Sequence, residues 1–276
     1  MKLFELTRAH KEQLQIIGVY LGLAVGLITC AVTNEWYLMG ISILIATWHG
    51  IFGNNIALHR LFSHRSFTTT RPKEIFLAIS TIFLGSNGPI TYCAIHRHHH
   101  LHSDAPRDPH SPHQSGFWYI GLSLWAFRTL EQKAQLRVSM PKDLMRDPVL
   151  KFIELNYHAI WLAVMAAFYL LGGWTVLLYG LLVPAGLYVL IANIGTNVIS
   201  HSDVFNSSYR NFDTDDQSRN SNFVQLLTMG EGYQNNHHLN CTTCSQAFKP
   251  GEFDPSGWLT KKLFAIDFIE VPQYNK

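Results

Sequence analysis

Five of the seven residues at positions 96–102 are histidines, and their spacing sorts them. In a helix, His96, His99 and His100 share one face, whereas His98 points away from it. Three neutral imidazoles that converge from one helical turn are suited to binding a transition metal. This segment therefore predicts metal chemistry.

A second cluster near the carboxyl end of the chain repeats the same spacing. Gln234, His237 and His238 stand at i, i+3 and i+4, with a glutamine in the first place. A third pair, His59 and His64, is five residues apart, or about 140° around a regular helix. This pair could flank a metal only where the helix ends or bends, and the apolar run containing it stops there.

A polar pair closes the last long apolar run of the chain. Asn197 and His201 are four residues apart and share a helical face, so they are a candidate ligand pair. A single ion takes about four to six ligands, so the histidines in these clusters fit two ions better than one. The eight histidines concerned are His59, His64, His96, His99, His100, His201, His237 and His238. Five further histidines are expected to be surface, packing or supporting residues: His98, His102, His110, His113 and His158.

The ligand type narrows the choice of metal. Imidazole suits zinc, copper, iron and nickel, but zinc is redox-silent and normally closes a site with four ligands. A pair of imidazole sites next to a bilayer makes most sense as a redox centre that activates oxygen. Cys241 and Cys244 form a CxxC that could be half of a zinc site, but no second CxxC follows, so two ordinary reduced thiols are the favoured interpretation.

The distribution of charge indicates a membrane protein. The chain is 47% hydrophobic and only 14% charged, against about 25% charged in ordinary soluble domains. All 21 lysines and arginines lie in residues 2–11, 60–151 and 210–276. Each of the two intervening regions is long enough for two crossings of about 20 apolar residues. The predicted spans are residues 16–32, 37–58, 153–171 and 174–200.

The fold predicted from this pattern is an all-α membrane protein with four transmembrane helices. The positive-inside rule places both termini and the central segment in the cytoplasm, so residues 59–152 and 201–276 form a cytoplasmic helical cap. We expect one integral-membrane domain over residues 1–276. No cleavable signal peptide is expected, since no small-residue cleavage site follows the first apolar run. The net charge of +2 gives no argument for binding nucleic acid.

Three shorter segments lie between the spans. The apolar run at residues 75–85 is too short to cross a bilayer, which predicts an interfacial or re-entrant helix. Residues 116–127 contain clustered Trp and Tyr that suit the level of the lipid headgroups. Residues 131–151 read as a charged linker with helical character.

These histidine motifs resemble those of a known family. The boxes at residues 59–65, 96–100 and 230–238 are similar to the three histidine boxes of the membrane fatty-acid desaturases of the acyl-CoA and acyl-lipid type. Two connecting signatures, at residues 108–118 and 216–220, also look like that family. The resemblance covers about residues 40 to 265, in order and with the expected gaps.

The resemblance implies four transmembrane helices, a cytoplasmic cap, a hydrophobic acyl tunnel and a di-iron centre held by the box histidines. His201 matches a ligand at the end of the fourth helix, and Asn197 matches a residue that reaches a metal through water. The family usually has histidine where this chain has Gln234. An amide oxygen can still coordinate, but the exact ligand count is then open.

The implied reaction removes two hydrogens from adjacent methylenes of a saturated acyl chain, using oxygen, to leave a cis double bond. The acyl chain would be carried on CoA, on acyl carrier protein or in a lipid. No fused haem domain is apparent, so the electrons would come from a separate donor such as a ferredoxin or a small cytochrome. Arg97, Arg107 and Lys133 are candidate contacts for that donor or for an anionic headgroup, although such charges are often only solvated.

Two other functions compete with this one. A histidine-box membrane hydroxylase would use a similar centre, but His59 and His64 have four residues between them, as in acyl desaturases, whereas the hydroxylases usually have three. A metal transport or storage protein would need ionisable residues deep within several spans. Here the histidines gather at one predicted membrane face, which favours desaturation.

Overall fold

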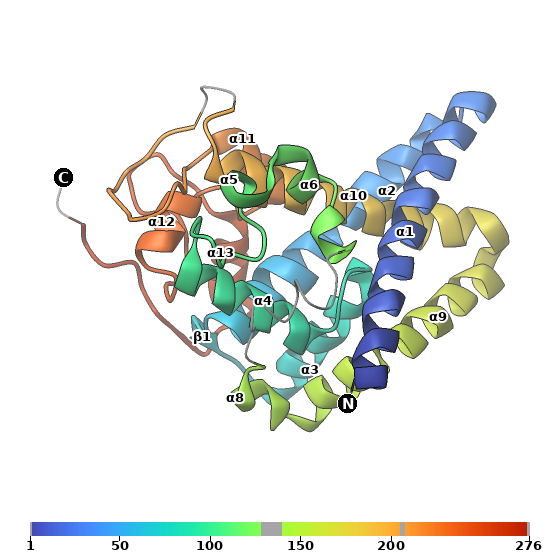
Figure 1. The fold of residues 1–276 in the computed structure, drawn as a ribbon, viewed down its shortest axis with the longest axis horizontal. Helices are drawn as coiled ribbons and strands as arrows, with labels where there is room; N and C mark the ends of the chain where they lie inside the picture. Colours follow the sequence, from blue (N-terminus) through green and yellow to red (C-terminus); the bar gives the residue numbers. More distant parts are fainter. Residues whose placement is uncertain (1, 128–139, 205–207, 275–276) are drawn as a thin grey trace.

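The computed structural model describes residues 2–127, 140–204 and 208–274, and these are mostly helical (Figure 1). The strands within them are two residues each, β1 (Phe67–Thr68) and β2 (Asp267–Phe268). They pair antiparallel with Phe67 opposite Phe268. This short pairing fastens the carboxyl-terminal segment beside the first histidine box.

The first two long helices confirm the apolar runs at the amino-terminal end. They are α1 (Lys2–Thr33) and α2 (Trp36–His49), and α2 continues without a break as the π-helix η1 (Gly50–Ser63). The predicted second helix, residues 37–58, is therefore too short by five residues. The extra turn stays helical because its polar residues are buried against the carboxyl-terminal part of the chain, as the contacts of Arg60 show below.

The second region without lysine or arginine, residues 152–209, forms a helical segment with a sharp break. Asp147 accepts hydrogen bonds from the N–H groups of Val149 and Leu150, so α9 (Pro148–Leu177) begins five residues before the predicted 153. The break lies at Gly172 and Gly173, as predicted, and Gly173 has φ of +62°, a conformation that favours glycine. The chain then continues as η4 (Leu178–Leu182), α10 (Val183–Ile191), η5 (Ala192–Val198) and η6 (Ile199–His201). Figure 1 shows the two halves diverging from this bend at the edge of the molecule.

Three helical segments of the described chain are long and apolar enough to cross a membrane: Lys11–Thr33, Trp36–Ser63 and Pro148–His201. A bent pair follows the first histidine box, made of α3 (Arg71–Ser80) with η2 (Thr81–Leu84), and α4 (Pro89–His102). Its two arms meet at 85°, which is the geometry of a broken span or a re-entrant loop. The re-entrant prediction for residues 75–85 agrees with this bend.

The remaining elements are short. The described residues contain α5 (Pro112–Ser115), α6 (Phe117–Gly121), η3 (Leu124–Phe127), α8 (Lys142–Met145), α11 (Asn222–Thr228), α12 (Gln234–Leu239), α13 (Pro255–Leu259) and η7 (Thr260–Phe264). The interfacial segment expected at residues 116–127 is thus two short helices, α6 and η3. The first part of the expected charged linker, residues 131–139, lies outside the described residues.

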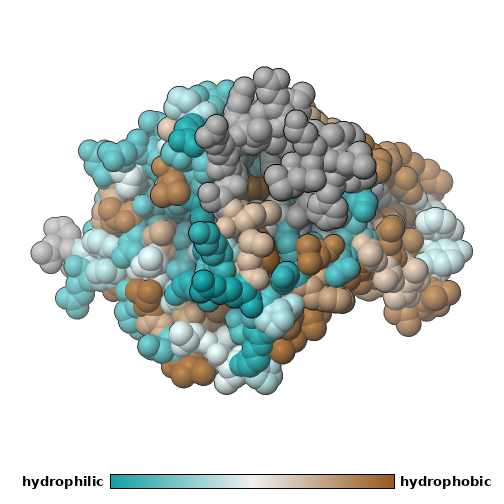
Figure 2. Space-filling model, turned by 60° about the horizontal axis from the view of Figure 1, so that its bottom comes forward, coloured by the Kyte–Doolittle hydropathy of each residue, from teal (hydrophilic) through white to brown (hydrophobic). Residues whose placement is uncertain are grey.

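The surface divides into an apolar and a polar side. Leu44, Leu170, Leu171 and Trp174 are each at least 70% exposed, although soluble proteins bury such residues. Figure 2 shows hydrophobic residues gathered on the side where Figure 1 places α1 and α9, and mainly hydrophilic ones on the side of α12 and α13. An apolar surface of this kind suits contact with lipid.

Candidate metal centre

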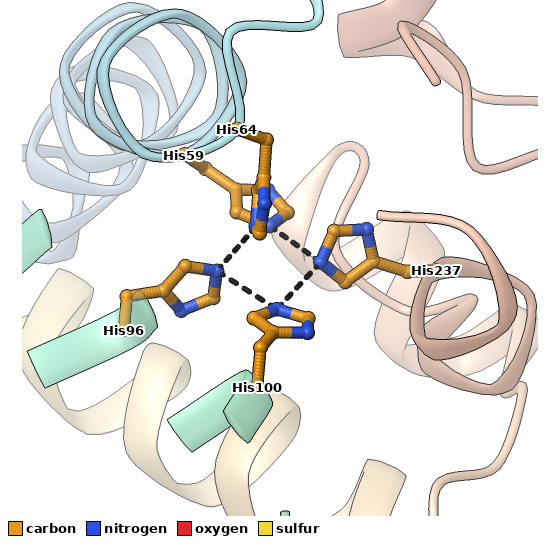
Figure 3. Close-up of side chains that lie close together, drawn as sticks. All are labelled: His59, His64, His96, His100 and His237. Atoms are coloured by element: carbon orange, nitrogen blue, oxygen red, sulfur yellow. Dashed lines mark hydrogen bonds between the residues drawn. The ribbon is translucent and has the colours of Figure 1, made fainter. Parts of the chain in front are cut away.

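Five histidines from three separate elements meet in one cluster (Figure 3). The Nε2 atom of His96 lies 2.8 Å from that of His64 and 3.1 Å from that of His100. The Nε2 atom of His237 lies 2.9 Å from that of His59 and 3.0 Å from that of His100. Together these residues form the five-histidine cluster, whose candidate ligand atoms all lie within 4.8 Å of one another.

The π-helix explains how His59 and His64 can face the same point. In a π-helix the hydrogen bonds join residues five apart, so such residues stack one turn above the other. The N–H of His64 donates to the carbonyl of His59 at 3.1 Å, which is this pattern. The prediction that the helix ends at this pair is confirmed, because η1 ends at Ser63 and His64 caps it, and the wider π-helical turn just before that end aligns the two histidines.

Three further histidines form a second group next to the first. His99, His201 and His238 also bring their ligand atoms within 4.8 Å of one another, and we call them the three-histidine cluster. The Nε2 atoms of His99 and His238 are 3.3 Å apart, and the His201 ring centroid is 5.0 Å from that of His99. The structure thus brings all eight predicted histidines together, in one group of five and one of three.

Buried carboxylates lie behind the imidazoles of the three-histidine cluster. His99 Nδ1 donates to Asp108 at 2.8 Å, and His201 Nδ1 donates to Asp104 at 3.0 Å. His238 Nδ1 is in contact with Asp216. A carboxylate behind a histidine fixes its tautomer and orientation, and makes it a stronger metal ligand. In the five-histidine cluster Glu231 lies 2.7 Å from His59 Nδ1, at ion-pair distance but not aligned as a hydrogen bond.

The protonation of these groups fits a cation site. Burial alone would raise the pKa of Asp104, but its hydrogen bond with His201 prevails and lowers the pKa to about 2. The pKa values of Asp108 and Asp216 are also held below their ordinary range, against the effect of burial, by the histidines they face. Each carboxylate therefore stays ionised at neutral pH. Because the carboxylate accepts from Nδ1, the neutral form of each facing imidazole has its free lone pair on Nε2.

The lone pairs are what a metal ion requires. Burial lowers the pKa of His238 to about 4, so its imidazole is neutral at pH 7. His99 and His238 both direct Nδ1 at a carboxylate, and their Nε2 atoms are 3.3 Å apart. A metal ion beside this pair would be bound by both nitrogens. The residues present therefore fit a transition-metal centre with nitrogen ligands.

A buried ion network holds the first box in place. Arg60 is 2% exposed, and its guanidinium donates to Glu231 at 2.6 Å and to Asp254 at 2.9 Å. It also donates to three backbone carbonyls, those of Asn55, Gly230 and Cys244. Arg60 thus connects η1 to the loop before α12 and to the carboxyl-terminal segment.

The loop carrying Glu231 packs tightly because of a glycine. A Cβ at Gly232 would lie 2.1 Å from the backbone nitrogen of Gln225 in α11, which no side chain tolerates. The N–H of Gly232 instead donates to the side chain of Gln225 at 2.7 Å. This close approach positions Glu231 behind His59 and places α12, with His237 at its centre, against the cluster.

Gln234 and Asn197 lie at the edge of the centre. Both border a cavity of about 290 Å³ that is also lined by His59, His96 and His201. The Gln234 amide donates to the backbone carbonyl of Glu231 at 3.1 Å, and the Asn197 amide donates to Asn193 at 3.1 Å. In each case the amide nitrogen has a partner, which leaves the amide oxygen as the candidate donor to a metal or to its water.

The other histidines largely behave as expected. His110 stacks on His99 at 4.4 Å, and His113 Nε2 lies 2.5 Å from the backbone carbonyl of His201, so both support predicted ligands. His158 bonds to Gln15 at 2.8 Å, away from the centre. His98 and His102 contact each other, with ring centroids 4.6 Å apart.

The CxxC contributes no candidate metal ligand within the described residues. Cys244 is buried, and neither it nor Cys241 joins a group of candidate metal ligands there.

The first of the predicted surface charges, Arg97, is bound within the fold. The Arg97 guanidinium binds Asp143 and the backbone carbonyls of Phe62 and Ser63. It therefore secures the end of η1 and is a poor candidate for a donor contact. Arg107 is exposed, and Lys133 lies outside the described residues.

Roles for Arg60 and for the four carboxylates that face the histidines, Asp104, Asp108, Asp216 and Glu231, were not predicted from the sequence. All of them but Asp104 lie within segments that were singled out only as connecting signatures or histidine boxes. A signal was available, because an acidic residue rarely stands in an apolar or histidine-rich segment without a charged partner. The identity of each partner depends on contacts between distant parts of the chain, as for Arg60 and Asp254.

Comparison with known proteins agrees with this centre. The model of the fatty acid desaturase family matches residues 34–248. The chain is 29% identical over 249 residues to an sn-1 stearoyl-lipid 9-desaturase of Anabaena variabilis, covering 90% of this chain and 88% of that protein. It is 31% identical over 236 residues to Delta-9 acyl-lipid desaturase 1 of Arabidopsis thaliana, covering 84% and 73%.

A third relative carries a different activity in its name. The chain is 33% identical over 271 residues to a hex-5-enoyl-[acyl-carrier protein] acetylenase of Moorena producens (strain JHB), covering 90% of this chain and 83% of that protein. The family match spans most of the chain and includes every histidine of both clusters. The chain therefore belongs to the fatty acid desaturase family, and it is a membrane-bound oxidoreductase that desaturates acyl chains.

Proposed function

We propose that the two histidine clusters hold two iron ions, one in each cluster, and that the cavity beside them holds the acyl chain. The five-histidine cluster supplies five nitrogen ligands and the three-histidine cluster supplies three. Asn197 and Gln234 offer amide oxygens that complete the second set, directly or through water. The observation that carries the proposal is the pair of adjacent clusters whose Nε2 lone pairs converge.

Iron fits this donor set and this reaction better than the other metals that imidazole binds. Zinc has no redox chemistry, and desaturation removes two electrons from the acyl chain. When bound, a reduced iron pair supplies the oxygen-activating chemistry needed to break unactivated C–H bonds. The carboxylates behind His99, His201 and His238 keep those ligands oriented and singly protonated.

The overall reaction balances with an external donor. A saturated –CH2–CH2– unit, one O2, two electrons and two protons give –CH=CH– and two waters. The cavity holds the acyl chain against the centre and excludes water, so only the two methylenes nearest the clusters react. The two electrons come from a separate carrier such as a ferredoxin or a small cytochrome, and the acyl chain is bound to CoA, to acyl carrier protein or in a lipid.

We further propose that the chain is one integral-membrane domain that crosses the bilayer four times. A straight helix over the 54 residues Pro148–His201 would be about 80 Å long, far more than the bilayer core of about 30 Å. The break at Gly172 and Gly173 therefore supports two spans. Basic residues flank these regions but are absent from their turns, which supports cytoplasmic termini and a cytoplasmic cap.

The function is tested by gas chromatography–mass spectrometry of total fatty acids from a host that expresses this chain. We expect a new monounsaturated acid that is absent from the host without the chain, and iron analysis of the purified protein should give two irons per chain. A hydroxy acid would instead place the chain among the hydroxylases. A product with a triple bond would give it the activity named for the Moorena relative.

One prediction tests the carboxylates behind the ligands. Asp216→Asn is expected to weaken metal binding or activity by about 10- to 100-fold, because a neutral amide no longer fixes the tautomer and basicity of His238. Iron content after dialysis against a chelator measures the effect. Asp215→Asn is the matched control, since Asp215 is the exposed neighbour. Equal iron retention by the two variants would contradict the assigned role of Asp216.

A further inference from the structure

A second cavity, of about 280 Å³, lies beside the one that borders the metal centre. The two cavities have five lining residues in common, and these stand between them: Asn54, Tyr188, Ala192, Thr196 and Glu231. The first cavity is also lined by cluster histidines, whereas the lining of the second contains none. The shared residues therefore form a partition between the cavity that borders the metal centre and the cavity that does not.

A buried hydrogen bond closes the partition. The Tyr188 hydroxyl donates to Asn54 Oδ1 at 2.8 Å, and the two residues are 9% and 8% exposed. The Asn54 amide donates in turn to Asn55, which is bound to the backbone carbonyl of Thr228 at 2.8 Å. The Tyr188 ring is thus tied across from α10 to η1 and α11, and it is the largest side chain of the partition.

The lining of the first cavity combines exposed and buried residues. Glu12 and Met140 line it, and Met140 is 41% exposed, so the cavity reaches the surface there. Tyr188 and Val189 also line it and are almost fully buried. An acyl chain entering with its polar carrier outside would direct its methyl end towards Tyr188.

We propose that Tyr188, held by Asn54, is the stop that limits how long an acyl chain the cavity accepts. This rests on the proposed placement of the acyl chain in the first cavity. The second cavity is the space that a longer chain would occupy if the stop were removed. Its lining includes Ile43 and Leu226, which are 51% and 72% exposed, so it reaches an apolar part of the surface.

The test is Tyr188→Ala, assayed by supplying the expressing host with two saturated acids that differ by two carbons and measuring the ratio of their unsaturated products. Each buried methylene favours binding by about fourfold, so for two methylenes the ratio should move towards the longer acid by about 15-fold. Leu187→Ala is the matched control, because Leu187 lines only the second cavity, and it should keep the wild-type ratio. Tyr188→Phe retains the ring and should stay closer to wild type than to the alanine variant.

An unchanged ratio in an active Tyr188→Ala protein would overturn the proposal, as would an equal shift in Leu187→Ala. If Tyr188→Ala does not accumulate in the host, Ala192→Leu is the second variant, because it adds bulk to the same partition. It should move the product ratio towards the shorter acid, and an unchanged ratio would again overturn the proposal. Failure of the proposed function looks different, since the wild type would then form no unsaturated product from either acid.

Discussion

Replacing His99 by alanine is expected to abolish desaturation, by more than about 100-fold, and to leave the purified protein with about one iron in place of two. The reason lies in the division of the ligands into five and three. The three-histidine cluster loses a third of its imidazoles and leaves Asp108 buried without its partner. The five-histidine cluster, by contrast, would keep four imidazoles after any single loss, which is enough for one ion.

Product analysis in the expressing host and iron analysis of the purified protein measure this effect together. His102→Ala is the matched control, because His102 lies on the same helix, α4, but contacts His98 outside both clusters. The control should keep two irons and full activity. Retention of both irons by His99→Ala would show that His99 is not a ligand, whatever happened to the activity.

Replacing Arg60 by methionine is expected to destabilise the protein by about 3–5 kcal/mol. The substitution keeps most of the side-chain volume but leaves Glu231 and Asp254 buried without their cation. Burial alone would raise the pKa of Glu231, and the charges of His59 and Arg60 lower it, so a carboxylate that loses Arg60 is costly to keep ionised. Glu231, the carboxylate beside His59, would also lose its fixed position.

The loss is measured as the apparent Tm of the purified protein in detergent, which should fall by about 10 °C. Arg65→Met is the control, because Arg65 is about half exposed and its ion pair with Asp143 stabilises by at most about 1 kcal/mol. A variant that combines Arg60→Met with Glu231→Gln and Asp254→Asn should recover part of the Tm, since no buried charge is left unpaired. An equal Tm for Arg60→Met and Arg65→Met would contradict this role of Arg60.

Much of the ligand set could be predicted from local spacing. In α4, His96, His99 and His100 share a face because the helical repeat brings residues three and four apart together, and the same holds for His237 in α12. The apolar runs without lysine or arginine likewise predicted the long helices and the break at Gly172 and Gly173. These features depend only on neighbours in the chain.

Which histidine joins which cluster could not be predicted from this spacing. His99 and His100 are adjacent in sequence, yet one joins the three-histidine cluster and the other the five-histidine cluster. A regular helical repeat would also point His64 away from His59, whereas the π-helix brings both into the same cluster. Small changes in helical geometry decide such assignments, and residue types alone do not encode them.

Residue spacing was enough to predict that imidazoles gather at the ends of apolar helices, and the motifs identified the family. Only the folded chain shows which carboxylate lies behind each histidine, how Arg60 joins Glu231 to Asp254, and that Tyr188 meets Asn54 across the cavity. Helical periodicity relates residues within a turn or two, whereas these contacts lie outside one regular helix and some join residues far apart, 134 positions for Tyr188 and Asn54 and 194 for Arg60 and Asp254. Tertiary packing is therefore needed to bring them within hydrogen-bonding distance.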